Sequence, residues 1–211
     1  MPSVLLINGG VRGATGDSGR ACGLARSLLH TRGVETDEIV LASCHDEMLT
    51  LRERLRKSDA MLFFTGTYWG SWGSPLQRFF ELITADEGGE LFLGKPGAAV
   101  VTMDSVGGSD VGARLLLALN LMGCAIPPLG LVVLSRVGLA VAEKPGFEDV
   151  WRESDLAVLI SNLLAASVKT GASFHSWPIE RAHGPQGAFP LWGPVDLGLP
   201  NVLGKTTRDD D

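Results

Sequence analysis

The sequence predicts an α/β fold in which helices cover both faces of a parallel β-sheet. Two observations support this prediction. Short apolar segments alternate with segments whose apolar residues recur at helical spacing, and glycines or polar residues separate the two kinds. When a helix follows each strand, neighbouring strands run in the same direction, and a sheet of this kind is buried on both faces.

Five segments have the short apolar runs that are typical of buried strands. The run "SVLLIN" ends in a polar residue and opens a glycine-rich loop, and "AMLFFT" is followed by a loop rich in glycine and aromatic residues. The predicted strands are residues 3–8, 35–42, 60–65, 97–103 and 129–135.

Five further segments have helical periodicity. The segment "SPLQRFFELI" places its apolar residues on one face, while Gly33 and Gly123 are stop signals for two of the other helices. The predicted helices are residues 18–33, 46–58, 74–83, 109–123 and 148–169.

Composition restricts the classes of partner. The chain has 211 residues, of which 45% are hydrophobic and 20% charged, as in an ordinary globular protein. Its net charge is −6, and no segment clusters lysines and arginines. We therefore expect neither a nucleic acid nor a membrane as partner, but a small molecule.

The chain is expected to be cytoplasmic, because "MPSVLLIN" has no basic leader and too short an apolar run for a signal peptide. Residues 115–134 are long and apolar enough to suggest a membrane span, but a polar residue, a glycine and two prolines interrupt them, which predicts a helix followed by a strand. The three cysteines, Cys22, Cys44 and Cys124, lie far apart and are expected to be buried thiols.

The composition changes near residue 170. Residues 1–170 are expected to form the α/β domain, and residues 171–211 a Pro/Trp-rich C-terminal arm with a disordered end. Aromatic residues are costly to leave in water, so we expect the arm to lie on its own or a neighbouring subunit rather than to fray.

Three loops are expected at one edge of the sheet. In an open parallel sheet, ligands bind outside the carboxyl ends of the strands, where the strand order reverses. The first loop is "NGGVRGATGDSGR", the second is the start of "TGTYWGSWGSPLQRFFE", and the third is "DSVGGSD". A loop that needs only to turn would use small polar residues, whereas the second combines glycines with large aromatics, as a loop that covers a flat ligand needs.

The first loop suits a phosphate group. A helix N-terminus presents unpaired amides and a partial positive charge, and Arg12, Thr15 and Ser18 add donors. Neither dinucleotide nor P-loop spacing of glycines is present, so a single phosphate is expected. Two alternatives remain: the glycines serve only the turn, and Asp17 is only an N-cap.

Other chemistries have weaker support. "GDSG" resembles a serine protease motif, but the surrounding βα pattern contradicts that fold. The four histidines lack metal-ligand spacing and form no recognisable triad, so we assign no metal site and no catalytic side chain.

Residues 3–135 resemble the NAD(P)H-dependent FMN reductase family of flavodoxin-like proteins. The segment "SDAMLFFTGTYWGSWGSPLQRFFE" is similar to that family's second flavin loop, and "GKPGAAVVTMDSVGGSDVGARLLLALNLMGC" to its fourth strand, glycine-pair loop and following helix. The resemblance implies a flavodoxin-like, doubly wound five-stranded sheet with strand order 2-1-3-4-5. Sites in this family commonly lie near a subunit interface, and together with the aromatic and proline content of the arm this favours a homodimer or homotetramer.

The resemblance implies that FMN is the cofactor and NADPH or NADH the co-substrate. Hydride would pass through flavin N5 to a flavin, a quinone or a similar small acceptor, with no catalytic side chain, because the flavin performs the chemistry. The resemblance implies that the phosphate contacts are Arg12, Thr15 and Ser18. The contacts to the ring are Thr67, Tyr68, Trp69 and Gly70. The contacts to the opposite edge are Asp104, Ser105, Gly107 and Gly108. Trp72 is assigned to ring cover or to a subunit contact.

Three positions depart from the family pattern. Gly66 stands where the family usually has proline, and Gln77 where it usually has lysine. Asp17 puts a carboxylate beside the expected phosphate, so phosphate binding requires Asp17 to point outward while Ser18 faces the ligand. Two other functions stay open: a non-enzymatic flavodoxin-like electron carrier, and a flavin-free protein that binds another phosphorylated ligand or acts through protein contacts.

Overall fold

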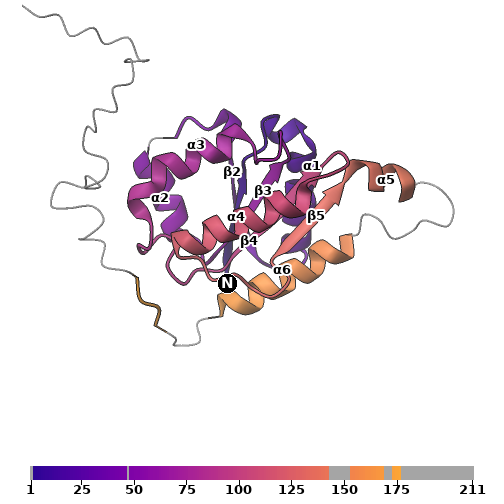
Figure 1. Ribbon diagram of the computed structural model, residues 1–211. Helices are drawn as coiled ribbons and strands as arrows, with labels where there is room; N and C mark the ends of the chain where they lie inside the picture. The colour runs from indigo at the N-terminus through magenta and orange to yellow at the C-terminus, as the bar shows by residue number, and fades with distance from the viewer. Residues whose placement is uncertain (1, 47, 143–152, 169–172, 177–211) are drawn as a thin grey trace, which may run out of the picture. The chain divides into compact units, whose positions relative to one another are not determined.

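The computed structural model describes residues 2–46, 48–142, 153–168 and 173–176. Its centre is a parallel sheet of five strands in the order β2-β1-β3-β4-β5 (Figure 1). The strands are β1 (Ser3–Asn8), β2 (Glu35–Val40), β3 (Ala60–Gly66), β4 (Gly97–Met103) and β5 (Leu131–Ser135). The predicted fold class and strand order are confirmed.

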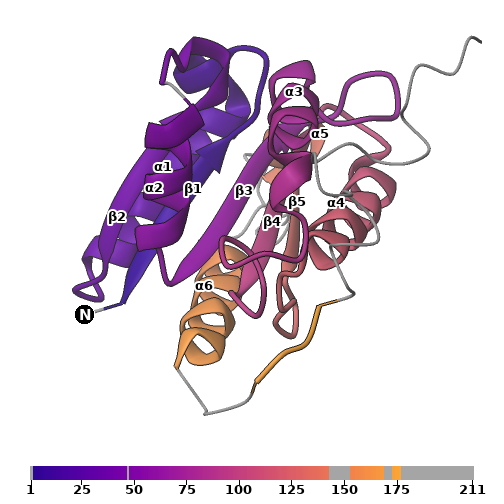
Figure 2. The same ribbon diagram turned by 90° about the vertical axis from the view of Figure 1, so that its left-hand side faces the viewer.

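Helices cover both faces of this sheet (Figures 1 and 2). On one face, the buried side chains belong to α1 (Asp17–His30) and α6 (Glu153–Ser167). On the other face, they belong to α2 (Met48–Lys57), α3 (Ser74–Ile83) and α4 (Gly108–Met122). The two layers follow from strand geometry, because successive side chains of a strand point to opposite faces.

The middle strand β3 shows this alternation. Phe63 packs with the helices α2, α3 and α4, whereas Phe64 packs with α1 and α6. All seven residues of β3 are buried. A continuous apolar run in the sequence therefore indicates a strand buried on both sides.

The structure differs from the predicted elements at three places. The second strand ends at Val40 because Leu41–Ser43 forms a 3₁₀ turn. A short helix, α5 (Arg136–Ala142), follows β5 directly and was not predicted. The last helix begins at Glu153 in the structure, and residues 148–152 of the predicted helix lie outside the described residues.

The two segments with unusual composition have different outcomes. Residues 115–134 form the end of α4 and most of β5, as predicted, and no helix among the described residues is both long and apolar enough to cross a membrane. Of the predicted arm, the structure describes only residues 173–176, in which the ring of Phe174 lies against Gly94. The rest of the arm lies outside the described residues.

Candidate cofactor site

The three predicted loops meet at the carboxyl edge of the sheet. They leave β1, β3 and β4, and the chain reverses its direction of strand addition between β1 and β3. A cavity of about 230 Å³ opens at this edge. The residues that line it are Arg12, Gly16, Asp17, Ser18, Gly66, Thr67, Tyr68, Thr102, Met103, Asp104 and Arg136.

Asn8 holds the first loop in place. Its side chain is completely buried at the end of β1. The Asn8 Nδ2 donates to the carbonyl of Gly13 at 3.1 Å, and its Oδ1 accepts from the Gly10 amide at 3.1 Å. Both polar groups of a buried amide are thus used to fix a glycine-rich loop, which stabilises the loop before any ligand binds.

The start of α1 has free hydrogen-bond donors. Gly16 is the N-cap and no side chain caps the helix, so the amides of Asp17, Ser18 and Gly19 have no backbone acceptor among the described residues. The Ser18 side chain is only 4% exposed, yet its hydroxyl makes no hydrogen bond with the described residues. Because Ser18 lines the cavity, its hydroxyl is available to a ligand.

Asp17 differs from one expectation for it. It is not the N-cap, since Gly16 occupies that position; it is one of the residues that line the cavity, and its side chain is 40% exposed. Its carboxylate lies 3.8 Å from Arg136 Nε and 4.0 Å from an Arg20 terminal nitrogen. Two exposed arginines thus lie near this carboxylate, and neither is close enough for a hydrogen bond.

The second loop is a tight hairpin. The Tyr68 amide donates to the Ser71 carbonyl at 2.8 Å, and the Ser71 amide returns a bond of 2.9 Å to Tyr68. Trp69 and Gly70 between them have φ values of 49° and 75°, which defines a type I′ turn. Such a turn favours Asn-Gly, so a tryptophan at its first position is strained.

Trp69 projects fully into solvent from this turn, with an exposed fraction of 107%. Trp69 therefore contributes nothing to the core of the domain. The amides of Trp69 and Gly70 take part in no backbone hydrogen bond with the described residues, whereas those of Thr67 and Tyr68 donate to Thr102 and Ser71. Free donors of the second loop thus lie at its tip.

Thr65 anchors the return of the second loop. Its completely buried hydroxyl accepts from the Gly73 amide at 2.9 Å. Gly73 in turn packs so tightly against the Gly9 carbonyl of the first loop that a Cβ would not fit. The Tyr68 ring lies over Gly66, within 3.1–3.3 Å of where a Cβ on that glycine would be. Glycine in place of the family's proline thus leaves room for this ring.

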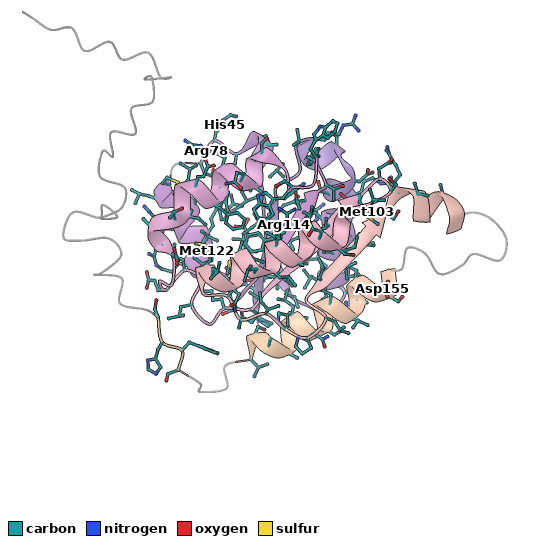
Figure 3. The ribbon with its side chains drawn as sticks, in the orientation of Figure 1. His45, Arg78, Met103, Arg114, Met122 and Asp155 are labelled. Carbon is teal, nitrogen blue, oxygen red and sulfur yellow. The ribbon has the colours of Figure 1, made fainter. Side chains whose placement is uncertain are left out.

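Trp72 lies against α3 and α4 rather than at the cavity. Its ring meets Phe80 edge-on at 6.0 Å, and its Nε1 donates to Gln77 Oε1 at 2.9 Å. The Arg114 guanidinium lies 5.9 Å from the Trp72 ring centre and donates to the carbonyl of Gly70. Arg114, labelled on α4 in Figure 3, thereby ties the hairpin to that helix.

Backbone conformation explains the first glycine of the third loop's pair, and packing explains the second. Gly107 has φ 87° and is the N-cap of α4, and Gly108 leaves no room for a Cβ beside Val133. The Gly108 amide also donates to the sulfur of Met103 at 3.3 Å. Met103 is paired with Ser135 in the sheet and is labelled near the start of α5 in Figure 3.

The cavity brings together five of the residues predicted from the sequence: Arg12, Ser18, Thr67, Tyr68 and Asp104. It does not include Thr15, Trp69, Gly70, Ser105, Gly107 or Gly108. The Thr15 hydroxyl instead donates to the Arg12 carbonyl at 2.9 Å. The contacts that we assigned to these six residues stay predictions.

Sequence reasoning missed several residues of the site. Thr102, Met103 and Arg136 line the cavity, and Asn8 and Thr65 brace its loops. For Asn8 and Thr65 the signal was a polar residue at the end of an apolar strand. For Arg136 the only signal was its position directly after the fifth strand.

The groups with clearly shifted pKa values lie outside the cavity lining. Hydrogen bonds from Arg54 lower the pKa of Asp37, and burial lowers the pKa of Lys95, which donates to the Leu55 carbonyl at 2.7 Å. Burial raises the pKa of the Cys22 thiol and raises that of Cys124 to about 12. Among the described residues, no three His, Cys, Asp or Glu side chains gather in a metal-binding group.

Several solved structures share this fold. An NADH:FMN oxidoreductase, EmoB, in its apo form has a TM-score of 0.65 at 14% identity, covering 81% of this chain and 93% of its own. FerB, a flavoenzyme NAD(P)H:(acceptor) oxidoreductase from Paracoccus denitrificans, has a TM-score of 0.55 at 20% identity, covering 79% and 96%. A flavodoxin from Pseudomonas aeruginosa has a TM-score of 0.54 at 21% identity, covering 78% of this chain and 97% of its own.

These likenesses show the fold, and the sequence itself shows the family. No curated protein sequence matches the chain significantly. The family model for NADPH-dependent FMN reductase, however, matches residues 2–138, which contain all five strands and all three loops. The chain belongs to the NADPH-dependent FMN reductase family.

Proposed function

We propose that this protein is an FMN-dependent oxidoreductase that takes hydride from NADPH or NADH and passes it to a small acceptor such as a flavin or a quinone. Membership of the family and the flavodoxin-like fold support FMN as the cofactor. The observation that supports the proposal most strongly is the Ser18 hydroxyl: its residue is only 4% exposed and lines the cavity at the uncapped start of α1, and the hydroxyl has no hydrogen-bond partner among the described residues.

The residues around Ser18 fit a phosphate group. The Ser18 hydroxyl lies at the cavity wall with no partner among the described residues, so it is free to donate to a phosphate oxygen. The free amides at the start of α1 and the Arg12 guanidinium add donors on the same cavity. We assign the FMN phosphate to Ser18, Arg12 and these amides.

The second and third loops fit a planar ring with polar edges. We assign the flat faces to Tyr68 and Trp69, and the ring's polar edge to the free amides of Trp69 and Gly70. Asp104 lines the opposite side of the cavity. The strained turn that presents Trp69 is consistent with a functional role, because strain of this kind is concentrated at ligand sites.

When bound, FMN supplies a centre, N5, that accepts and donates hydride. The protein then needs only to hold the cofactor, orient its ring and limit the access of water. That requirement agrees with a cavity whose histidine-free lining contains no acid–base triad.

We also propose that the chain assembles as a homodimer or homotetramer, which light scattering of the full chain would test.

The experiment that tests this function is anaerobic addition of NADPH, and separately NADH, to the purified protein loaded with FMN. We expect the flavin absorbance near 450 nm to bleach within seconds. Adding a quinone should restore it, and steady-state nicotinamide oxidation should require the acceptor. Bound FMN that neither nucleotide reduces would instead indicate an electron carrier. A protein that binds no FMN would contradict the proposal altogether.

A further inference from the structure

A second arginine, Arg136, lines the same cavity as Arg12 and Ser18. It follows the last residue of β5 and is the first residue of α5. Its two neighbours are both anchored to the third loop: the Ser135 hydroxyl and the Val137 amide each donate to the Asp104 carbonyl at 3.1 Å. The backbone thus fixes the origin of the Arg136 side chain at the wall of the cavity.

The guanidinium of Arg136 makes no hydrogen bond with the described residues. Its distance of 3.8 Å to Asp17 is too long for a hydrogen bond, and the side chain makes no other polar contact with the described residues. Arg12 likewise makes no side-chain hydrogen bond with them. Four other arginines are engaged, because Arg26, Arg52, Arg54 and Arg56 donate to carboxylates at 2.6–2.9 Å.

The charges of the residues that line the cavity indicate a role for Arg136. Two arginines and two aspartates line the cavity: Arg12, Arg136, Asp17 and Asp104. Their formal charges cancel. A phosphate monoester carries a charge of about −1.5 to −2 at pH 7, so the charged side chains of the lining, taken together, give it no net attraction beyond that of the amides at the start of α1. Without Arg136 the lining would have an excess negative charge, and the Asp17 carboxylate would face the phosphate with less compensation.

We propose that Arg136 is a second phosphate-binding residue of the FMN site and that it offsets the repulsion between Asp17 and the phosphate. A guanidinium has five N–H donors, so it serves the carboxylate and the phosphate together. This inference rests on the proposed function, since it takes the phosphate to be that of FMN.

The test compares two variants that each remove one positive charge beside Asp17. R136Q removes the arginine that lines the cavity, and R20Q removes one that contacts the same carboxylate at 4.0 Å without lining the cavity. Titration calorimetry of the apo-protein with FMN and with riboflavin gives the affinities. We expect R136Q to weaken FMN by about tenfold and leave riboflavin unchanged, with R20Q within about twofold of wild type.

A second pair of variants tests the compensation of Asp17. D17N should tighten FMN binding, and it should recover part of the loss when combined with R136Q. Because Arg136 is 61% exposed, R136Q is expected to fold normally, which a thermal melt verifies.

Three outcomes would overturn the inference: unchanged FMN affinity in R136Q, equal losses for FMN and riboflavin, or equal losses in R136Q and R20Q. An R136Q variant that binds FMN normally but has a raised KM for NADPH would assign the arginine to the nucleotide and likewise overturn it. These outcomes are distinct from failure of the proposed function, in which the wild-type protein itself binds no FMN.

Discussion

The hydroxyl of Ser18 occupies the space that a Cβ on Gly10 would need. This contact joins the first loop to the start of α1, and it explains why glycine follows Gly9 in the loop. Ser18 is 4% exposed and lines the cavity, so its position depends on a residue that is not itself among the lining residues. Substitution of a residue that does not line the cavity, such as Gly10, is therefore expected to affect the candidate site.

The substitution G10A should push the Ser18 hydroxyl out of place and weaken FMN binding. Loss of a hydrogen bond to a charged group costs about 1.5–3 kcal/mol, which corresponds to roughly a tenfold to hundredfold loss in affinity. S18A should produce a similar loss without the steric change. Fluorescence titration with FMN checks both variants. Normal FMN affinity in S18A would show that Ser18 does not bind the phosphate.

Replacing Trp69 should separate stability from cofactor binding. Asparagine suits the left-handed conformation of this turn better than tryptophan, so W69N should stabilise the fold by up to about 1 kcal/mol. Aromatic stacking on a nucleobase is worth about 1–3 kcal/mol, and by analogy W69N and W69A should both weaken FMN by a comparable amount. Urea unfolding and flavin titration on the same variants measure the two effects. Unchanged FMN affinity in both variants would refute the ring contact.

Much of the fold was predictable from the sequence, because the spacing of apolar residues indicates which faces of a strand or helix are buried. The run "AMLFFT" has no polar residue before its end, and such a run is typical of a strand with both faces covered. The short helix at Arg136 was not predictable, because its seven residues are too few to show helical periodicity.

The site was predictable only in part, for a physical reason. Which loops meet follows from the topology of a parallel sheet, so Arg12, Ser18 and Tyr68 were identified. Which side chain of a loop lines the cavity depends on its turn. The type I′ turn sends Trp69 into solvent, although Tyr68 beside it lines the cavity. A fully buried brace such as Asn8 resembles an ordinary strand end in the sequence.

The brace at Thr65 should contribute measurably to stability. T65V keeps the shape of the side chain but removes the acceptor of the buried Gly73 amide, which costs about 1–3 kcal/mol. T15V is a suitable control, because the Thr15 hydroxyl also bonds a loop backbone group but is exposed, and its loss should cost under about 0.5 kcal/mol. Urea denaturation of the apo-proteins compares them. Equal stabilities of the two variants would contradict the bracing role.

The three thiols should differ in reactivity. Cys22 and Cys124 are buried and burial raises the pKa of each, so both stay protonated and inaccessible at pH 8. Cys44 was expected to be buried but is partly exposed, so it should react alone with an aromatic disulfide reagent in the native protein. All three should react in guanidinium chloride. Rapid reaction of more than one thiol in the native protein would contradict this assignment.

Raised thiol pKa values also predict how stability changes with pH. Above about pH 9 the unfolded chain loses these protons while the folded chain keeps them, so the free energy of unfolding should fall as pH rises toward about 12. Urea denaturation of the wild-type protein between pH 8 and pH 10.5 checks the direction of this change. The stability of a C124A variant should fall less steeply over the same range.

The central claim is that a phosphate-binding first loop and two ring-binding loops together form an FMN site. The most direct test is to titrate the wild-type apo-protein with FMN and with riboflavin under identical conditions. We predict that FMN binds at least about tenfold more tightly, because only FMN carries the phosphate that Ser18, Arg12 and the first amides of α1 would receive. Equal affinities for the two flavins would contradict this account.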